Sequence, residues 1–467
     1  MDKSRNYNID VIMQGIARVL GGVFSFFSVF ILTYLFNESE IGEYNLILSI
    51  VSIIASLGTL WLSQSVLRFF DEKKDAGSVF VLIGISTMIC LLIYGIVNFF
   101  LKQTNNLWVF AYVVMLVFYN VFDAIFRRSR RLLSYVALEL LLAISRVFPM
   151  IVLAKVTKSY NSIFASQCIV LFVFFVIMLF AHLDDIRGLK FYVNLDMLHE
   201  YLKFGVPLLG LAISNWFLTT SDRYVIKYFG ENAQVGIYST NYSLANSIYM
   251  MFSLIIVNAF HPIIMKEWDR DKTKTLNLVS HTIDLYFMLM IPLTFYGCLK
   301  SRVLLSMFKG DLYASHSDIF IWTAIGIFFY GLSLLLHKYY ELTQKTKMIL
   351  LINLIAAVIN VILNIILIPI LGFEIAAFTT FLAYIIYILI VRMLTYKVFP
   401  LEIKKKNCVI ILSSLLLFYI LDLVIVKNDS VLGFLVEGAI YVIYTIFVYQ
   451  ITNIVDLKSL EGLVKRK

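Results

Sequence analysis

The sequence predicts an all-α polytopic membrane protein. About 14 transmembrane helices form two parallel six-helix lobes around a central cavity, followed by two extra C-terminal helices. Three observations predict this fold. Apolar residues make up 61% of the chain and charged residues 15%, with a mean hydropathy of +0.87, whereas soluble domains are nearer half apolar and a quarter charged. Basic residues also gather on alternate connections between apolar segments, and one short motif recurs after six segments.

Each apolar segment is long enough to cross the hydrocarbon core, which needs roughly 20 residues per helix. The first six are predicted near 11–35, 43–66, 78–101, 107–126, 132–155 and 162–182. Eight more are predicted near 204–226, 238–262, 282–304, 317–338, 348–370, 374–396, 407–426 and 431–451. The last two segments also fit a re-entrant hairpin, which is the alternative to two full spans.

The distribution of positive charge predicts the orientation. Of the 39 basic residues, 28 lie at the N-terminus or on even-numbered connections and nine on odd-numbered ones; two lie inside spans. By the positive-inside rule, both termini are expected in the cytoplasm. A miscounted helix would exchange the sides downstream, so the asymmetry supports fourteen spans. The net charge of +9 therefore indicates topology and attraction to anionic headgroups, with no nucleic acid expected as partner.

A short internal repeat predicts the lobes. Ile41-Gly42-Glu43-Tyr44 follows the first span and Val235-Gly236-Ile237-Tyr238 follows the seventh, 194 residues later. Six spans separate the two copies, and this even number gives them the same orientation, as in transporters with parallel repeats. We expect an N-terminal lobe at 1–198, a C-terminal lobe at 199–400, and two additional helices with a cytoplasmic tail at 401–467.

Two arginines inside spans are the first candidates for substrate contact. Arg18 has Gln14 on the same face of the first span, and Arg146 has Glu139 on the same face of the fifth. Guanidinium groups stay charged and present forked donors, which suits a diphosphate in a central cavity. The alternatives are that Arg18 reaches the cytoplasmic headgroups and that Arg146 forms an interhelical ion pair with Glu139.

Uncharged and acidic residues within the spans give further candidates. Asn215, Asn246 and Asn360 are predicted to line a sugar-binding cavity, although interhelical hydrogen bonds explain such residues equally well. Asp422 and Glu437, in the last two spans, are expected to make a local structural contact.

Signatures of catalysis are missing from the sequence. It contains no GxxxxGK[ST] phosphate loop, no HExxH and no GxSxG motif. Asp269-Arg270-Asp271 has the D-x-D form used by glycosyltransferases, but its connection is too short to belong to a nucleotide-binding domain. The four cysteines are too far apart to suggest a metal site or a disulfide framework. We therefore expect a protein that is not an enzyme and has no cofactor or metal.

Several short motifs resemble a known family when taken in order. Phe204-Gly205-Val206-Pro207-Leu208, Ser221-Asp222-Arg223-Tyr224 and Val235-Gly236-Ile237-Tyr238-Ser239 resemble the start of the second lobe of Wzx-type polysaccharide flippases. These are polysaccharide biosynthesis proteins of the MATE-like multidrug/oligosaccharidyl-lipid/polysaccharide exporter superfamily. The segments Tyr340–Thr346 and Asn360–Asn364 fit the same pattern.

The resemblance implies a function and a location. Such proteins move undecaprenyl-diphosphate-linked oligosaccharide repeat units from the cytoplasmic to the outer leaflet by alternating access. The product serves O-antigen (lipopolysaccharide), capsule or exopolysaccharide biosynthesis. The resemblance places the chain in the bacterial inner (plasma) membrane as a multi-pass protein. Its implied partners are the lipid-linked oligosaccharide, the bilayer, and the polymerase and other polysaccharide assembly proteins.

Other functions stay open from sequence alone. A lipid II flippase or a cation-coupled drug exporter would share the superfamily, and a membrane polysaccharide polymerase or acyltransferase is a remote alternative. Export of one negative charge gains about 2.3 kcal/mol per 100 mV of membrane potential, so a diphosphate can move without ATP. Coupling to protons or sodium is also open, with Glu139 as the candidate carboxylate.

Overall fold

The computed structural model describes residues 20–101, 107–181, 191–309, 311–402, 404–424 and 431–452. All regular structure in these ranges is helical. Thirteen of the described helices are long and apolar enough to cross a membrane. A shorter apolar helix, Leu20–Leu35, lies within the first predicted span. The predicted fold, with about 14 membrane helices, is confirmed.

The helices follow the predicted order with one interruption. The first half contains α2 (Glu38–Phe69), α3 (Glu72–Leu101), α4 (Leu107–Arg128), α5 (Leu132–Ser145), α6 (Phe148–Thr157) and α7 (Asn161–Ala181). The second half contains α9 (Leu195–Phe229), α10 (Asn232–Trp268), α11 (Lys272–Leu299), α14 (Ser317–Leu336), α16 (Thr346–Leu371) and α17 (Ile375–Thr395). Three short helices, α12 (Ser301–Ser306), α13 (Asp311–Ala314) and α15 (Lys338–Leu342), lie at the ends of spans. The chain closes with α18 (Lys405–Val424) and α19 (Val431–Ile451).

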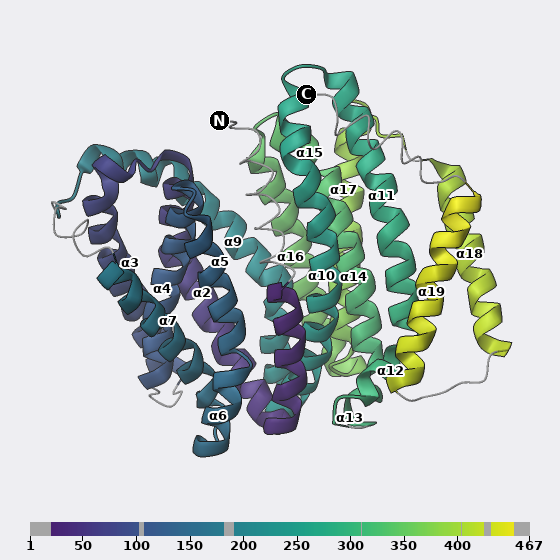
Figure 1. The fold of residues 1–467 in the computed structure, drawn as a ribbon, viewed down its shortest axis with the longest axis horizontal. Coiled ribbons are helices and arrows are strands. Elements are labelled where there is room, and N and C mark those ends of the chain that lie inside the picture. The colour runs from purple at the N-terminus through teal and green to yellow at the C-terminus, as the bar shows by residue number, and fades with distance from the viewer. Residues whose placement is uncertain are drawn as a thin grey trace.

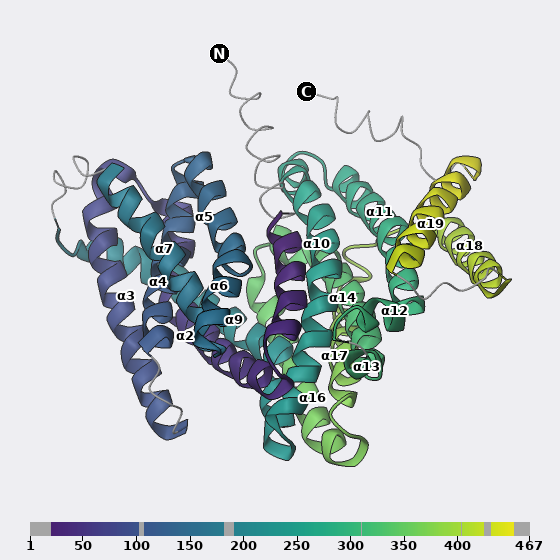
Figure 2. The ribbon, with the colours of Figure 1, turned by 60° about the horizontal axis from the view of Figure 1, so that its bottom comes forward.

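Two helical bundles stand side by side, one formed by α2–α7 and the other by α10–α17 (Figures 1 and 2). Each has its own large apolar core, one centred on α2, α3, α4 and α7 and the other on α10, α11, α14 and α17. We refer to them as the N-terminal and C-terminal lobes. The boundary after residue 198 stays a prediction.

The first helix packs against the C-terminal lobe. Ser25 Oγ lies 3.3 Å from Ser247 Oγ of α10, and the Tyr34 hydroxyl donates to the carbonyl of Met307 at 2.8 Å. The rings of Phe30 and Phe308 meet with centroids 5.1 Å apart. In both views this purple helix runs beside α10 (Figures 1 and 2). The first described helix therefore packs on the C-terminal lobe, and the N-terminal lobe begins at α2.

Helix α2 joins the two lobes through backbone contact. Asn37 caps it, accepting from the Glu40 amide while Glu40 accepts from the Asn37 amide. A side chain at Gly42 would overlap the carbonyl oxygen of Asn232, and one at Gly236 would overlap the carbonyl of Glu38. The repeated motif thus lies where the two copies touch, glycine facing glycine.

A second close contact joins α2 to α9 near the opposite end of α2. A side chain at Gly205 would overlap the backbone of Trp61. Beside it, the Ser65 hydroxyl donates to the carbonyl of Tyr201 at 2.9 Å. Small residues let helix backbones approach closely in membranes, where packing rather than water drives association. This half of α9 belongs to the N-terminal core, which includes Met197 and Tyr201, so the lobes meet along the first part of α2.

The appended helices α18 and α19 pack on α11. Lys300, which follows α11, pairs with Asp422 at 2.8 Å and with Glu437 at 2.6 Å. The Tyr441 hydroxyl donates to the carbonyl of Pro292 at 3.0 Å. The predicted structural contact of the two acidic residues is confirmed. Both helices are long enough to be spans, which favours the two-span reading over the hairpin.

The glycine contact leads to a stability prediction. Gly42→Ala or Gly236→Ala is expected to lower the free energy of unfolding by about 1–3 kcal/mol. The added methyl group would clash with backbone atoms of the facing helix, which cannot move away as a flexible side chain could. Thermal unfolding of the purified protein in detergent measures the loss. Gly84→Ala on α3, where a side chain would meet no atom within 4 Å, is the matched control. Equal melting temperatures for all three variants would contradict the contact.

Candidate functional site

A buried carboxylate lies inside the C-terminal lobe. Asp222 of α9 is 1% exposed. The Tyr238 hydroxyl donates to its Oδ2 at 2.6 Å, and the Thr380 hydroxyl donates to the same oxygen at 2.9 Å. Asn364 Nδ2 donates to Oδ1 at 2.7 Å. Four helices, α9, α10, α16 and α17, therefore converge on one acidic group.

Two more residues complete this cluster, which we name the Asp222 cluster. Asn360, one turn before Asn364, is fully buried. With its amide oriented to satisfy both atoms, its nitrogen donates to Asp222 Oδ1 at 3.1 Å and its oxygen accepts from Thr380. The Thr379 hydroxyl donates to the side-chain amide oxygen of Asn364, Oδ1. Every helix around the carboxylate thus supplies a polar partner.

The nearby guanidinium does not neutralise Asp222 directly. Arg223 donates to the Ser239 hydroxyl at 3.1 Å and lies over the ring of Tyr242, 5.5 Å from its centroid. No ion pair to Asp222 is found among the described residues. Arg223 thus acts on Asp222 only through space. A buried carboxylate without a direct ion pair is costly, so the position favours a bound proton or cation. The amide and hydroxyl oxygens beside the carboxylate are the ligand types that hard cations prefer.

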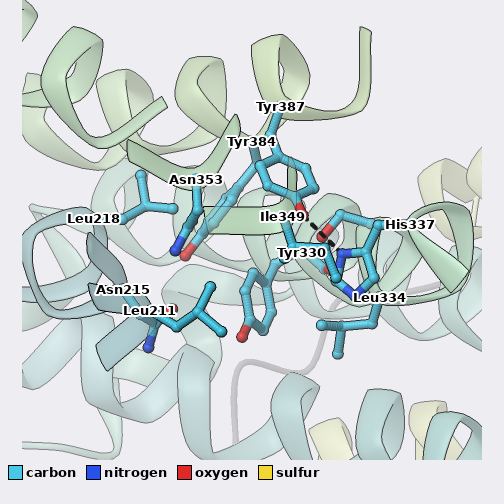
Figure 3. A pocket seen from close by; sticks show the side chains of 11 residues that line it. Leu211, Asn215, Leu218, Tyr330, Leu334, His337, Ile349, Asn353, Tyr384 and Tyr387 are labelled. Carbon is cyan, nitrogen blue, oxygen red and sulfur yellow. Dashed lines mark hydrogen bonds between the residues drawn. The ribbon is translucent and has the colours of Figure 1, made fainter. Parts of the chain in front are cut away.

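A cavity of about 180 Å³ lies in the same lobe, between α9, α14, α16 and α17. Figure 3 shows rings and amides converging on it. Its polar wall consists of Asn215, Tyr330, Ser333, His337, Asn353, Tyr384 and Tyr387. One predicted substrate-contact residue, Asn215, therefore lines a cavity, but one within the C-terminal lobe.

A charged cluster lies beyond one wall of this cavity. His337 Nδ1 lies 2.7 Å from the Tyr387 hydroxyl (Figure 3). Its Nε2 lies 3.0 Å from Glu341 Oε1. Lys338 Nζ pairs with the other carboxylate oxygen of Glu341 at 2.6 Å and lies 3.0 Å from His261 Nδ1. The Glu341 side chain is 26% exposed, so this cluster reaches the surface.

In the N-terminal lobe, Arg146 lies where the fifth span is broken. Helix α5 ends at Ser145 and α6 starts at Phe148, with Pro149 in the first turn of α6. Pro149 lacks an amide hydrogen and its ring crowds the preceding turn, so one continuous helix is disfavoured. Discontinuous membrane helices of transporters often mark binding sites.

The surroundings of Arg146 are aromatic and polar. It is half-buried and interacts electrostatically with Tyr44, Tyr112, Tyr119 and Glu139. The Tyr119 hydroxyl donates to Glu139 Oε1 at 2.5 Å. The structure thus brings Arg146 and Glu139 into one cluster, as both the cavity hypothesis and its ion-pair alternative require.

The remaining predicted site residues lie apart. Gln14 and Arg18 fall outside the described residues. Asn246 is half-buried on α10, next to Ser247, which contacts the first helix. Among the five described candidates, Asn360 belongs to the Asp222 cluster, Asn215 lines the C-terminal cavity, and Arg146 and Glu139 lie in the other lobe. These residues do not form one continuous site in this structure.

The sequence analysis missed Asp222 because the residue lies at the polar end of the predicted span 204–226. Helix α9 continues to Phe229, two turns beyond Asp222, so the carboxylate lies inside the helix bundle rather than at the end of the helix. The asparagines that face Asp222 are distant from it in the sequence, so no local motif predicts that they form a cluster. Asp269-Arg270-Asp271, in contrast, forms the turn between α10 and α11, where Asp271 caps α11 by accepting from the Lys274 amide.

Solved structures with the same arrangement are transporters. The lipid II flippase MurJ in an inward closed conformation is 17% identical, with a TM-score of 0.73, and the match covers 95% of this chain and 98% of that one. An inward-facing multidrug resistance MATE family transporter of the MOP superfamily is 15% identical, with a TM-score of 0.56 and coverage of 81% and 94%. A MATE transporter in complex with MaD5 is 14% identical, with a TM-score of 0.53 and coverage of 82% and 95%. The described helices thus have the fold of these flippases and exporters.

A family model shows to which protein family the chain belongs. The model of a polysaccharide biosynthesis protein family matches residues 31–318, more than half of the chain. The chain belongs to this family. A search of curated proteins gives no significant match. The family model identifies a polysaccharide biosynthesis protein, and the solved structures show that the described helices of this chain have the fold of membrane transporters.

The Asp222 cluster leads to a second stability prediction for this family member. Tyr238→Phe is expected to lower the free energy of unfolding by about 1.5–3 kcal/mol, the range for hydrogen bonds to charged groups. Tyr201→Phe is the control, because the buried Tyr201 hydroxyl has no hydrogen-bond partner among the described residues. Thermal unfolding in detergent compares the two. Equal stability of both variants would show that the Tyr238–Asp222 bond contributes nothing.

Proposed function

We propose that this protein moves polyprenyl-diphosphate-linked oligosaccharide repeat units across the bacterial plasma membrane. The units pass from the cytoplasmic to the outer leaflet, for O-antigen, capsule or exopolysaccharide biosynthesis. The observation that carries the proposal is the difference in structural coverage between relatives. The flippase matches 95% of this chain, whereas the two multidrug transporters match 81–82%. Residues 401–467, which contain α18 and α19, make up a part of the chain about as large as this difference in coverage. The chain thus matches the length of a carrier-lipid flippase better than that of a drug exporter.

A protein is needed for this movement on energetic grounds. Each sugar hydroxyl costs on the order of 1–3 kcal/mol to bury without a partner, so an oligosaccharide does not cross a bilayer unaided. The diphosphate also carries negative charge, and its export along the membrane potential gains about 2.3 kcal/mol per charge per 100 mV. A polar route between the lobes and this potential are sufficient, so neither ATP hydrolysis nor an enzymatic step is part of the proposal.

The contact between the lobes provides the moving interface. The α2–α10 contact at Gly42 and Gly236 involves few side chains, and such a contact can separate as two rigid lobes rock. The paired copies of the repeat lie on opposite lobes, so their separation would open one end of the interface. We place this end at the outer face and both chain termini in the cytoplasm, following the distribution of basic residues.

Arg146 is our candidate for diphosphate contact, together with Arg18, Gln14, Asn215, Asn246 and Asn360 for the wider substrate. At a helix break, backbone groups lack helical partners and are free to bind a ligand. The Arg146 guanidinium adds a permanent positive charge there. Glu139 and the tyrosines fix its position. The lipid-linked oligosaccharide, the bilayer and the downstream polymerase are the partners that this role requires.

The coupling group in this proposal is Asp222 rather than Glu139. Both carboxylates interact electrostatically with a nearby guanidinium, Glu139 with Arg146 and Asp222 with Arg223. Asp222 differs in its burial and in its surrounding hydroxyl and amide donors, which form an enclosed site able to hold a proton or a sodium ion. We therefore assign Asp222 as the site through which a cation gradient assists transport.

The first functional prediction concerns lipid intermediates. Deletion of the gene is expected to leave complete lipid-linked repeat units on the cytoplasmic leaflet, because assembly continues while transport stops. Extraction of these lipids and protection from an external glycosidase measure their amount and sidedness. Accumulation of lipid II instead, with arrest of cell-wall synthesis, would assign the related carrier substrate and contradict the proposed one.

The second concerns Arg146. Arg146→Ala is expected to abolish most surface polysaccharide at normal protein levels, and Arg146→Lys to restore part of it, because lysine keeps the charge but loses the forked donors. Lys155→Ala, at an exposed position of α6, is the control. Full surface polysaccharide in the Arg146→Ala strain would rule out its role in substrate contact.

The third concerns Asp222. In proteoliposomes, an imposed sodium or proton gradient is expected to accelerate translocation by the wild type but not by Asp222→Asn, which keeps the shape and loses the charge. Asp196→Asn, at an exposed position in the first turn of the same helix, is the control. A gradient response that survives in Asp222→Asn would remove Asp222 as the coupling group.

A further inference from the structure

We propose that the cavity between α9, α14, α16 and α17 is the aqueous path through which a cation bound at Asp222 exchanges with the cytoplasm. The path starts at the surface cluster of His337 and Glu341. This inference rests on the proposed role of Asp222 and adds a route and a direction to it. The site that binds the lipid-linked oligosaccharide plays no part in it.

Three helices, α9, α16 and α17, contribute residues to both the cavity and the Asp222 cluster. On α9, Leu218 of the cavity lies one turn from Asp222, and on α17, Tyr384 lies one turn from Thr380. On α16, Asn353 lies two turns from Asn360. On all three helices the cavity residues extend toward the same end of the molecule. The cavity is therefore stacked directly on the cluster.

Two tyrosines connect the inner wall to the carboxylate. The hydroxyl of Tyr384, which lines the cavity, lies beside that of Tyr242. The ring of Tyr242 stacks on Tyr238 with centroids 5.9 Å apart, and Tyr238 donates directly to Asp222. Side chains of three tyrosines thus lie in contact from the cavity to the buried acid, with hydroxyl contacts at both ends and a ring contact between Tyr242 and Tyr238.

The other end of the cavity reaches the surface. His337 and Tyr387 both line it, and they lie 2.7 Å apart. His337 also contacts Glu341, whose side chain is partly exposed. Lys338 pairs with the Glu341 carboxylate and holds it in place, so the mouth is polar and its charges are compensated. By the positive-inside rule this end faces the cytoplasm.

The cavity is large enough to hold water. Its volume of about 180 Å³ is well above the roughly 30 Å³ that one water occupies in the liquid. Its lining is largely apolar, with Leu211, Leu218, Leu334 and Ile349, and amide, hydroxyl and imidazole groups interrupt it on all sides. Water held at these polar groups would lower the desolvation barrier for a small cation.

The test uses silver ion, a monovalent cation that reacts with thiols. The reporter is Leu218→Cys, at the inner wall, in a chain whose native cysteines are replaced by serine and which still supports surface polysaccharide. Ser333→Cys, nearer the mouth, is a second reporter in case the first does not fold. The cysteines to be replaced are Cys90, Cys168, Cys298 and Cys408.

Matched variants separate a path from general access. Asn353→Phe fills the cavity, whereas Leu354→Phe adds the same ring at the next position, which is 43% exposed on the outside of α16. Ser253→Cys, fully buried outside the cavity and within bonding distance of Tyr286, is the inaccessible control. The reaction is followed in membrane vesicles of both orientations.

The expected result is that Leu218→Cys reacts with silver from the side of Glu341. Asn353→Phe should slow this reaction about tenfold or more, the effect of a modest added barrier, and Leu354→Phe should not. A reporter as inert as Ser253→Cys, or equal slowing by both phenylalanines, would overturn the path. Labelling needs no lipid-linked substrate. An inert reporter in a chain that still exports polysaccharide therefore contradicts the path alone, and a reactive one in a chain without export contradicts the function alone.

Discussion

The backbone contact of α2 with α9 and α10 is the constraint on which the molecule depends. Each lobe has its own core, and α2 belongs mainly to the N-terminal one; α10 belongs to the C-terminal core, and α9 contributes to both. Glycines at both ends of this contact bring main chains together without intervening side chains. In a bilayer, where lipid is as apolar as the helices, such close packing supplies much of the association energy. The contact therefore combines close backbone packing at the glycines with side-chain hydrogen bonds from α9 to α2.

The two lobes handle buried charge in different ways. In the N-terminal lobe, Arg146 and Glu139 lie in one cluster with tyrosines, so positive and negative charges compensate each other. In the C-terminal lobe, Asp222 has hydroxyl and amide donors and no ion pair among the described residues. Each carboxylate also has a guanidinium nearby, Arg146 for Glu139 and Arg223 for Asp222, without a direct ion pair among the described residues. The greater burial of Asp222 and its enclosing donors are the reasons why our proposal places the response to an ion gradient in the C-terminal lobe.

The sequence predicted the helices and the repeat well because hydropathy and span length act locally. Neither depends on which helix is a neighbour. The packing of the first helix against the C-terminal lobe could not be predicted, because contacts such as Tyr34 with Met307 join residues far apart in the chain. The depth of Asp222 was missed for the same reason. Its partner Asn364 was noticed as a polar residue in a span, but only the fold brings the two together. The break at Arg146 had a local signal in Pro149 that was not used.

Helix α9 links the proposed cation site to the interface between the lobes. One side of it carries Asp222 and the inner wall of the cavity. The other side contacts α2, where Trp216 donates to the carbonyl of Ser49 at 2.9 Å and the Tyr224 hydroxyl donates to that of Leu46 at 2.8 Å. Tyr224 is only two residues from Asp222, so a shift of α9 on cation binding reaches α2 without any intermediate element. A ligand moves an equilibrium only by its difference in affinity between two states. On this proposal, the interface and the cation site share one rigid helix, and this shared helix is what allows the affinity for the cation to differ between the two positions of the lobes.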